Sequence, residues 1–169
     1  MKMADDRGLS LVELIIVISI MAVMTGMLSL GLPMMFSRDA NYVAVRIDDA
    51  LTEARTLAMS KDGKVTYTLH IDSDPKGSTV EIKRVVGATE DKKTINLDKS
   101  VSITVKGDET PMSGDFIVEF DKAKGCVKTV NGSAPDKGVY TITVSSTKNT
   151  SNIKDVTLVT DTGRHYTEK

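Results

Sequence analysis

The sequence predicts an α+β protein: one long N-terminal helix, with a membrane half and an amphipathic half, packed on an antiparallel β-sheet or β-sandwich head. Three observations predict this fold. A long apolar run follows a short charged start, a helical stripe comes directly behind that run, and six later segments alternate apolar with polar residues. The expected outline is a lollipop, with a rod that carries a β head.

The apolar run occupies residues 9–36 and is long enough to cross a bilayer. No charged residue occurs from Leu14 to Phe36, and about 20 apolar residues cross a hydrocarbon core of about 30 Å. Lys2 and Arg7 precede the run, so the positive charge favours a cytoplasmic N-terminus and an exported head. A plain signal anchor and a cleaved secretory signal peptide are the alternative interpretations of this run.

Residues 37–61 are predicted to continue as an amphipathic helix. Their apolar residues recur at steps of three and four, which is the pattern of one buried stripe. Gly63 follows as a stop signal. The span and the stripe together predict one helix from about Leu9 to Ser60. The stripe consists of Val43, Ile47, Ala50, Leu51, Ala54, Leu57 and Ala58.

Residues 64–169 are predicted to form the β head. Six segments show the two-residue period of half-buried strands: KVTYTLHID, TVEIKRV, VSITVKG, DFIVEF, VYTITVS and DVTLVTD. Stretches rich in turn-forming residues separate them: DSDPKGS, GATEDKK, GDETPMSGD, VNGSAPDKG and STKNTSN. Many short strands after a single helix indicate an antiparallel sheet or sandwich, one face of which the helical stripe would cover.

Composition and motifs argue against several classes of function. Residues 37–169 carry equal numbers of basic and acidic side chains, so no basic surface for nucleic acid is expected. Cys126 is the single cysteine, which excludes an intrachain disulfide and a cysteine-based metal site. No arrangement of nucleophile, base and acid or of phosphate-binding glycines is present. We therefore expect a structural subunit without cofactors, not an enzyme.

Two acidic loops are the weak candidates for a metal site. One holds Asp72 and Asp74 beside a glycine, and the other holds Asp108, Glu109 and Asp115. Calcium sites use such carboxylates, but both stretches have the composition of hairpin turns. We expect no metal at either loop.

Gly8 and the residues directly after it resemble a known N-terminal motif. Gly8 followed by LSLVELIIVISIMAV resembles the N-terminal segment of type IV prepilins and of the pseudopilins of type II secretion. The resemblance implies cleavage between Gly8 and Leu9 by a prepilin peptidase, N-methylation of Leu9 and assembly into a helical filament. Ser10, Leu11 and Glu13 match the positions that follow. Leu9 departs from the phenylalanine that is usual at the first mature position.

The C-terminal part resembles one branch of that family more loosely. DVTLVTDTGRHYTEK and FDKAKGCVKTVNG are similar to the closing strand pair and the preceding hairpin of H-type minor pseudopilins and minor pilins. The family resemblance divides the chain into a cleaved leader (1–8), a transmembrane and polymerisation helix (9–36) and a pilin head (37–169).

Glu13 is the candidate assembly residue. An ionised carboxylate at bilayer depth costs several kcal/mol, and isolated intramembrane acids usually have a partner. The resemblance implies that Glu13 pairs with the N-terminal amine of a neighbouring subunit, which sets the register between the two. The implied partners are other pilin subunits, the prepilin peptidase, a platform membrane protein, an assembly ATPase and the membrane.

Three functions stay open at this point. The first is a minor pilin or pseudopilin that resides in the cytoplasmic membrane before it joins a periplasmic or extracellular filament. The second is a tip-located subunit that binds a ligand in adhesion or DNA uptake. The third is a membrane-anchored β-domain unrelated to pili.

Overall fold

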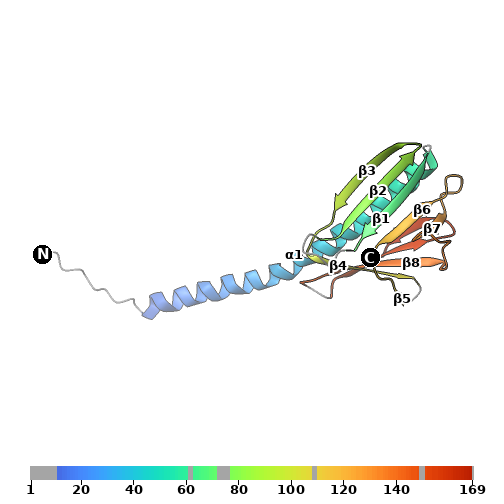
Figure 1. Ribbon diagram of the computed structural model, residues 1–169. Helices are drawn as coiled ribbons and strands as arrows, with labels where there is room; N and C mark the ends of the chain where they lie inside the picture. Colours follow the sequence, from blue (N-terminus) through green and yellow to red (C-terminus); the bar gives the residue numbers. More distant parts are fainter. Residues whose placement is uncertain (1–10, 61–62, 72–76, 108–109, 149–150, 169) are drawn as a thin grey trace. The chain divides into compact units, whose positions relative to one another are not determined.

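The computed structural model describes residues 11–60, 63–71, 77–107, 110–148 and 151–168, without the side chains of residues 26–38. A single helix, α1, runs over Leu11–Ser60, in agreement with the helix expected from about Leu9 to Ser60. Contacts divide the chain into two compact units, Met1–Met35 and Phe36–Lys169. The first unit contains the N-terminal half of α1. The second unit, the head, contains the rest of α1 and every described strand (Figure 1).

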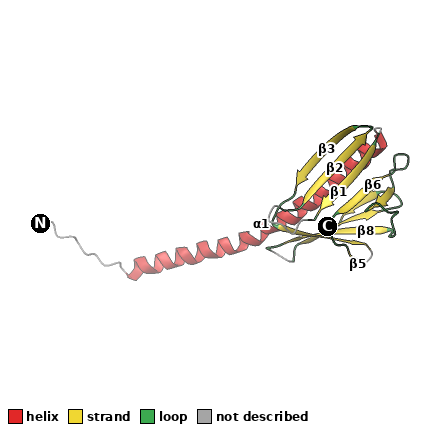
Figure 2. Ribbon diagram, in the orientation of Figure 1, coloured by secondary structure: helices red, strands yellow, loops and turns green. Residues whose placement is uncertain are grey.

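The described strands of the head form two antiparallel five-stranded sheets, so the fold is α+β (Figure 2). The first sheet has the order β3-β2-β1-β6-β7 and the second has the order β10-β9-β8-β4-β5. The strands are β1 Lys64–His70, β2 Thr79–Val86, β3 Thr89–Asn96, β4 Val101–Gly107, β5 Thr110–Pro111, β6 Phe116–Phe120, β7 Val127–Val130, β8 Val139–Ser146, β9 Ile153–Val159 and β10 Arg164–Thr167.

The apolar stripe of α1 is the centre of the head's core. All but one of the residues predicted for the stripe are buried, and Leu57 is half-buried against the same core. Ala40 and Ala44 extend the stripe by one turn. A stripe one third of a helix wide is what a helix needs when one side packs and the other side meets water.

Both sheets turn one face toward this core. In β1 and β8 the buried residues alternate with half-buried ones, as the two-residue period of a strand requires. Phe116 of the first sheet and Tyr140 of the second are in aromatic contact, with ring centroids 5.5 Å apart. Helix and sheets therefore share one hydrophobic core rather than two.

All six strands predicted from alternation are present, but the prediction that GATEDKK is only a turn is wrong. Gly87 and Ala88 make the turn, and β3 begins at Thr89 and pairs with β2 along its whole length. The prediction failed because β3 is an end strand with almost all its side chains exposed, so it has no apolar face to reveal its period. Its charged residues instead pair across to β2, as Lys83 does with Glu90 at 2.8 Å.

Arg55 ties α1 to two turns that are far away in sequence. Its Nε donates to the carbonyl of Gly125 at 2.9 Å, and one terminal nitrogen donates to the carbonyl of Thr162 at 3.1 Å. Gly125 and Gly163 both have positive φ, 65° and 63°. The two turns pass so closely that a Cβ built on Gly163 would lie 1.9 Å from the Gly125 oxygen. Glycine is required at this crossing for both reasons.

Replacing Gly163 with alanine tests this crossing. We expect Gly163→Ala to lower the free energy of unfolding by roughly 3 kcal/mol or more, because a left-handed backbone and a clash with a backbone atom act together. Chemical denaturation of the full chain in detergent measures the change. Gly87→Ala is the matched control, since Gly87 has φ 57° and no atom within 4 Å of a built Cβ. The control is expected to lower the free energy of unfolding by about 1 kcal/mol. Equal losses in the two variants would show that the close approach of the Gly125 and Gly163 turns adds no constraint.

Tyr67 provides a second test of the core. Its side chain is fully buried, its hydroxyl has no hydrogen-bond partner among the described residues, and burial raises its pKa far above the usual value. Folded Tyr67 stays protonated where unfolded tyrosine ionises, so stability falls as the pH rises above about 10. We expect Tyr67→Phe to match or exceed the wild type by up to about 1 kcal/mol, and to lose less stability between pH 9 and pH 11.

Thermal melting at a series of pH values measures this difference. Tyr166→Phe is the control, because Tyr166 is 50% exposed and its removal leaves the core unchanged. A Tyr67→Phe variant that melts well below the wild type at neutral pH would show that the hydroxyl has a partner.

Candidate functional site

The predicted assembly residue lies at the beginning of α1. Glu13 is in the first turn of the helix and its side chain is exposed. A carboxylate at this end of a helix is favoured by the positive end of the helix dipole. Gly8 and Leu9, the predicted processing residues, lie outside the described residues. The structure therefore places one of the three predicted site residues.

The helix around Glu13 is apolar on every side. From Leu11 to Met24 the large hydrophobic side chains are between 45% and 74% exposed. An amphipathic surface helix would bury one side of such a segment, and a contiguous apolar surface of this kind marks contact with lipid or with another protein. The exposed residues are Leu11, Val12, Leu14, Ile15, Ile16, Val17, Ile18, Ile20, Met21, Val23 and Met24.

The hydroxyl groups of this segment are satisfied inside the helix. Ser19 donates to the carbonyl of Ile15 at 2.7 Å, and Thr25 donates to the carbonyl of Met21 at 2.6 Å. Hydroxyls bonded back to the preceding turn have no need of water. Glu13 is the sole charged residue between Arg7 and Arg38 in the sequence, so it is the one group of this segment whose charge needs a partner or solvent.

Within the described residues, no helix is both long enough and apolar enough to span a membrane. The membrane segment predicted from the sequence, residues 9–36, lies partly outside the residues and side chains that the structure describes.

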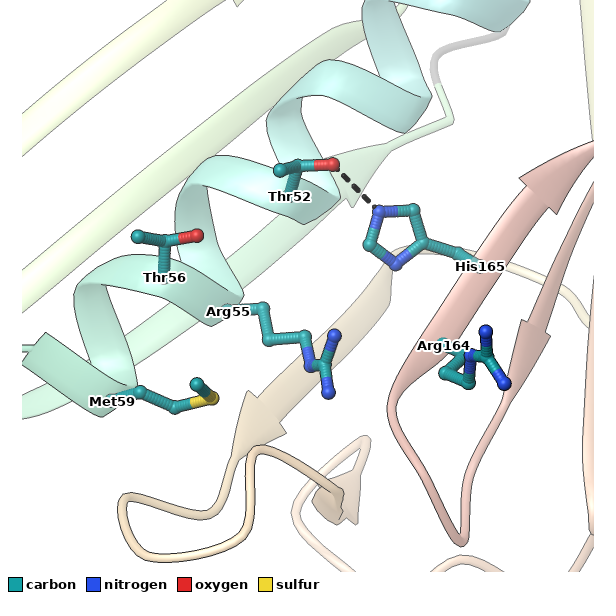
Figure 3. Close-up of a pocket in the computed structure, with 6 residues that line it drawn as sticks. All are labelled: Thr52, Arg55, Thr56, Met59, Arg164 and His165. Carbon is teal, nitrogen blue, oxygen red and sulfur yellow. Dashed lines mark hydrogen bonds between the residues drawn. The ribbon is translucent and has the colours of Figure 1, made fainter.

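A shallow groove of about 230 Å³ lies between α1 and β10 in the head (Figure 3). Thr52 and His165 meet across it, with 2.8 Å between the hydroxyl oxygen and Nε2 of the ring. The Arg55 guanidinium is occupied by the two turn carbonyls described above. Arg164 lines the rim, but it precedes His165 in a strand, so its side chain belongs to the opposite face of the sheet. The groove is a packing seam between helix and C-terminal strand rather than a ligand pocket.

The acidic loops proposed as weak metal candidates fall largely outside the description. Asp72, Asp74, Asp108 and Glu109 are not among the described residues. Asp115 is described, and it pairs with Nδ1 of His70 at 2.8 Å. Among the described side chains no group of three or more His, Cys, Asp and Glu is arranged to hold a metal ion.

Sequence reasoning missed the seam in which Arg55 of α1 bonds to two distant turns and His165 of β10 bonds to Thr52 of α1. Arg55 is not part of the predicted apolar stripe, yet it is half-buried and bonded to residues 70 and 107 positions away. Gly125 and Gly163, each in a turn before a short strand, were the available signal. Nothing in a single sequence shows that two such turns meet.

The comparisons with known proteins bear on the N-terminal segment. Residues 3–29 match the family model described as the prokaryotic N-terminal methylation motif, and this range contains Gly8, Leu9 and Glu13. No curated protein and no solved structure matches the chain. The motif implies a precursor that a prepilin peptidase processes and that then assembles with other pilin subunits. The match supports a type IV pilin-like protein and covers the N-terminal segment of the chain alone.

Proposed function

We propose that the chain is a minor pilin or pseudopilin of a type IV pilus or of a type II secretion-like filament. In this proposal the prepilin peptidase cuts between Gly8 and Leu9, Leu9 is N-methylated, and Glu13 guides the subunit into the filament. The protein acts through its surface and its polymerisation, not as an enzyme.

The observation that carries the proposal is the all-round apolar surface of α1 broken by one acid. The exposed large side chains from Leu11 to Met24 each gain about 1.5–3 kcal/mol when they leave water. That surface is stable only in lipid or among other helices of the same kind. A bundle of N-terminal helices in a filament supplies such surroundings after the subunit leaves the bilayer.

Glu13 gains a natural partner through cleavage. In the precursor the nitrogen of Leu9 is part of a peptide bond and cannot carry a charge. Cutting after Gly8 turns it into an amine, and the amine of a subunit already in the filament can pair with Glu13 of the next. An unpaired buried charge costs far more than the pair gains, so the pair selects one register between subunits.

The ending of the head supports assignment to the minor branch. β9 and β10 form an antiparallel pair joined by a turn that includes Gly163, which is the arrangement expected from the resemblance to H-type minor pseudopilins. Lys2 and Arg7 support a precursor whose N-terminus is cytoplasmic and whose head is exported.

Replacing Glu13 tests the assembly step. We expect Glu13→Ala and Glu13→Gln to be cleaved and inserted into the membrane like the wild type but to be lost from filaments, because the neighbour's amine is left without its carboxylate. The measurement is the amount of subunit in sheared filaments relative to the membrane fraction. Ser19→Ala is the matched control on the same helix. Normal incorporation of both Glu13 variants would refute the proposed pair.

Replacing Gly8 tests the processing step separately. We expect Gly8→Val to accumulate as an uncut precursor in cells that contain the peptidase, because a branched side chain then occupies the scissile position. Mass spectrometry of the N-terminus reads the outcome directly. The wild type should begin at methylated Leu9, and a wild-type chain that keeps its leader would instead indicate an unrelated membrane-anchored domain.

A further inference from the structure

His165 is a buried histidine that joins the C-terminal strand to α1. Its side chain is 7% exposed, and it lies in β10 opposite the buried Leu158 of β9. Nε2 of the ring lies 2.8 Å from the hydroxyl oxygen of Thr52 and 3.9 Å from Oδ1 of Asp48, both on α1 (Figure 3). Nδ1 lies 3.3 Å from the carbonyl oxygen of Gly163. Each ring nitrogen therefore has an oxygen atom in front of it.

These oxygens act as hydrogen-bond acceptors. A carbonyl oxygen cannot donate, so the contact with Gly163 is a hydrogen bond only when Nδ1 carries a proton. The Thr52 hydroxyl already donates to the carbonyl of Asp48 at 3.0 Å, which leaves its oxygen available to accept from Nε2. Oδ1 of Asp48 is buried and has no donor among the described residues. Protons on both ring nitrogens therefore match the acceptors on both sides of the ring.

A neutral ring leaves part of this arrangement unmet. With its one proton on Nδ1, the ring still bonds to Gly163, but the Thr52 hydroxyl must leave the Asp48 carbonyl to donate to Nε2. The Asp48 carboxylate then faces an uncharged ring. A buried carboxylate oxygen without a donor raises the free energy of the folded state, and a positive ring 3.9 Å away offsets that cost.

Two arginines oppose a positive charge on this ring. Arg55 of α1 and Arg164 of β10 line the same groove. The Arg55 guanidinium is bonded to two turn carbonyls, whose partial negative charges offset part of its charge. Arg164 is exposed and belongs to the opposite face of the sheet, so water screens its charge. Leu158, opposite the ring in β9, is uncharged. Asp48 is therefore the charge that acts on the ring most directly.

We propose that His165 and Asp48 form a pH-sensitive latch that fastens β10 to α1. The doubly protonated ring donates to the carbonyl of Gly163 and to the hydroxyl of Thr52, and it pairs with the Asp48 carboxylate. Histidine ordinarily gains its second proton below about pH 6.5. Because the charged form provides the stabilisation, the latch is complete at acid pH and is lost as the pH rises above that range.

The latch acts on an end strand. It adds to the pairing of β10 with β9 and to the bond between Arg55 and the carbonyl of Thr162. β10 is the outermost strand of the second sheet, so loss of the latch weakens the hold on the strand that covers the edge of β9. All of these residues belong to the head, so this inference goes beyond the proposed filament role and does not depend on it.

Amide hydrogen exchange of the full chain in detergent tests the latch. Exchange rates are corrected for their intrinsic dependence on pH, so that the corrected rates report the opening of the strand. We expect the amides of β10 to exchange about tenfold more slowly at pH 5.5 than at pH 8, because the ring is charged at the first pH and neutral at the second.

Substitutions identify the groups that cause this difference. Asp48→Asn and His165→Gln should each abolish it, because each removes one half of the pair. Asp49→Asn is the matched control, since it removes the same charge from the next residue of α1, whose side chain is exposed. His70→Gln is a second control, because His70 is the other histidine of the chain and lies in the first sheet. Both controls should keep the difference between the two pH values.

Nitrogen NMR of the histidine rings measures the protonation in the wild type, without any substitution that could disturb folding. The His165 ring should carry two protons at pH 5.5 and one at pH 8. A ring that stays neutral at pH 5.5, exchange of β10 that does not change with pH, or equal effects of Asp48→Asn and Asp49→Asn would each overturn the proposal.

Discussion

The head depends on one constraint, which is that α1 presents only a narrow apolar stripe. Alanines supply five of the eight residues that are buried on the stripe: Ala40, Ala44, Ala50, Ala54 and Ala58. The two sheets and this single helix share one hydrophobic core. Neither five-stranded sheet could bury its inner face without it.

The two halves of α1 have different surfaces. The half in the first unit exposes large apolar groups on all sides, whereas the half in the head separates a buried stripe from a polar surface. A filament subunit needs an apolar surface on one half of its helix, which can contact lipids or neighbouring helices. The other half needs a buried stripe that packs on a folded domain. The boundary between the two compact units lies near Met35, between these two segments.

The sequence predicted what local chemistry encodes and missed what depends on distant contacts. Alternation revealed six of the ten described strands. It failed at β3 because nearly all side chains of that strand are exposed, and it did not identify the short strands β5, β7 and β10. The motif singled out Gly8, Leu9 and Glu13 by resemblance, but the structure describes only Glu13 of the three. Arg55 and His165 could not be found in this way, because their partners lie 70 to 113 positions away.

Arg55 gives the head a route for mechanical load. In the proposed filament, tension carried by the N-terminal helices would pass from α1 into the strands of the head. One guanidinium reaches the turn before β7 and the turn before β10, while the Glu53 carboxylate reaches Lys93 of β3 at 2.6 Å. Directional bonds therefore link α1 to the end strand β3 and to the turns that precede β7 and β10.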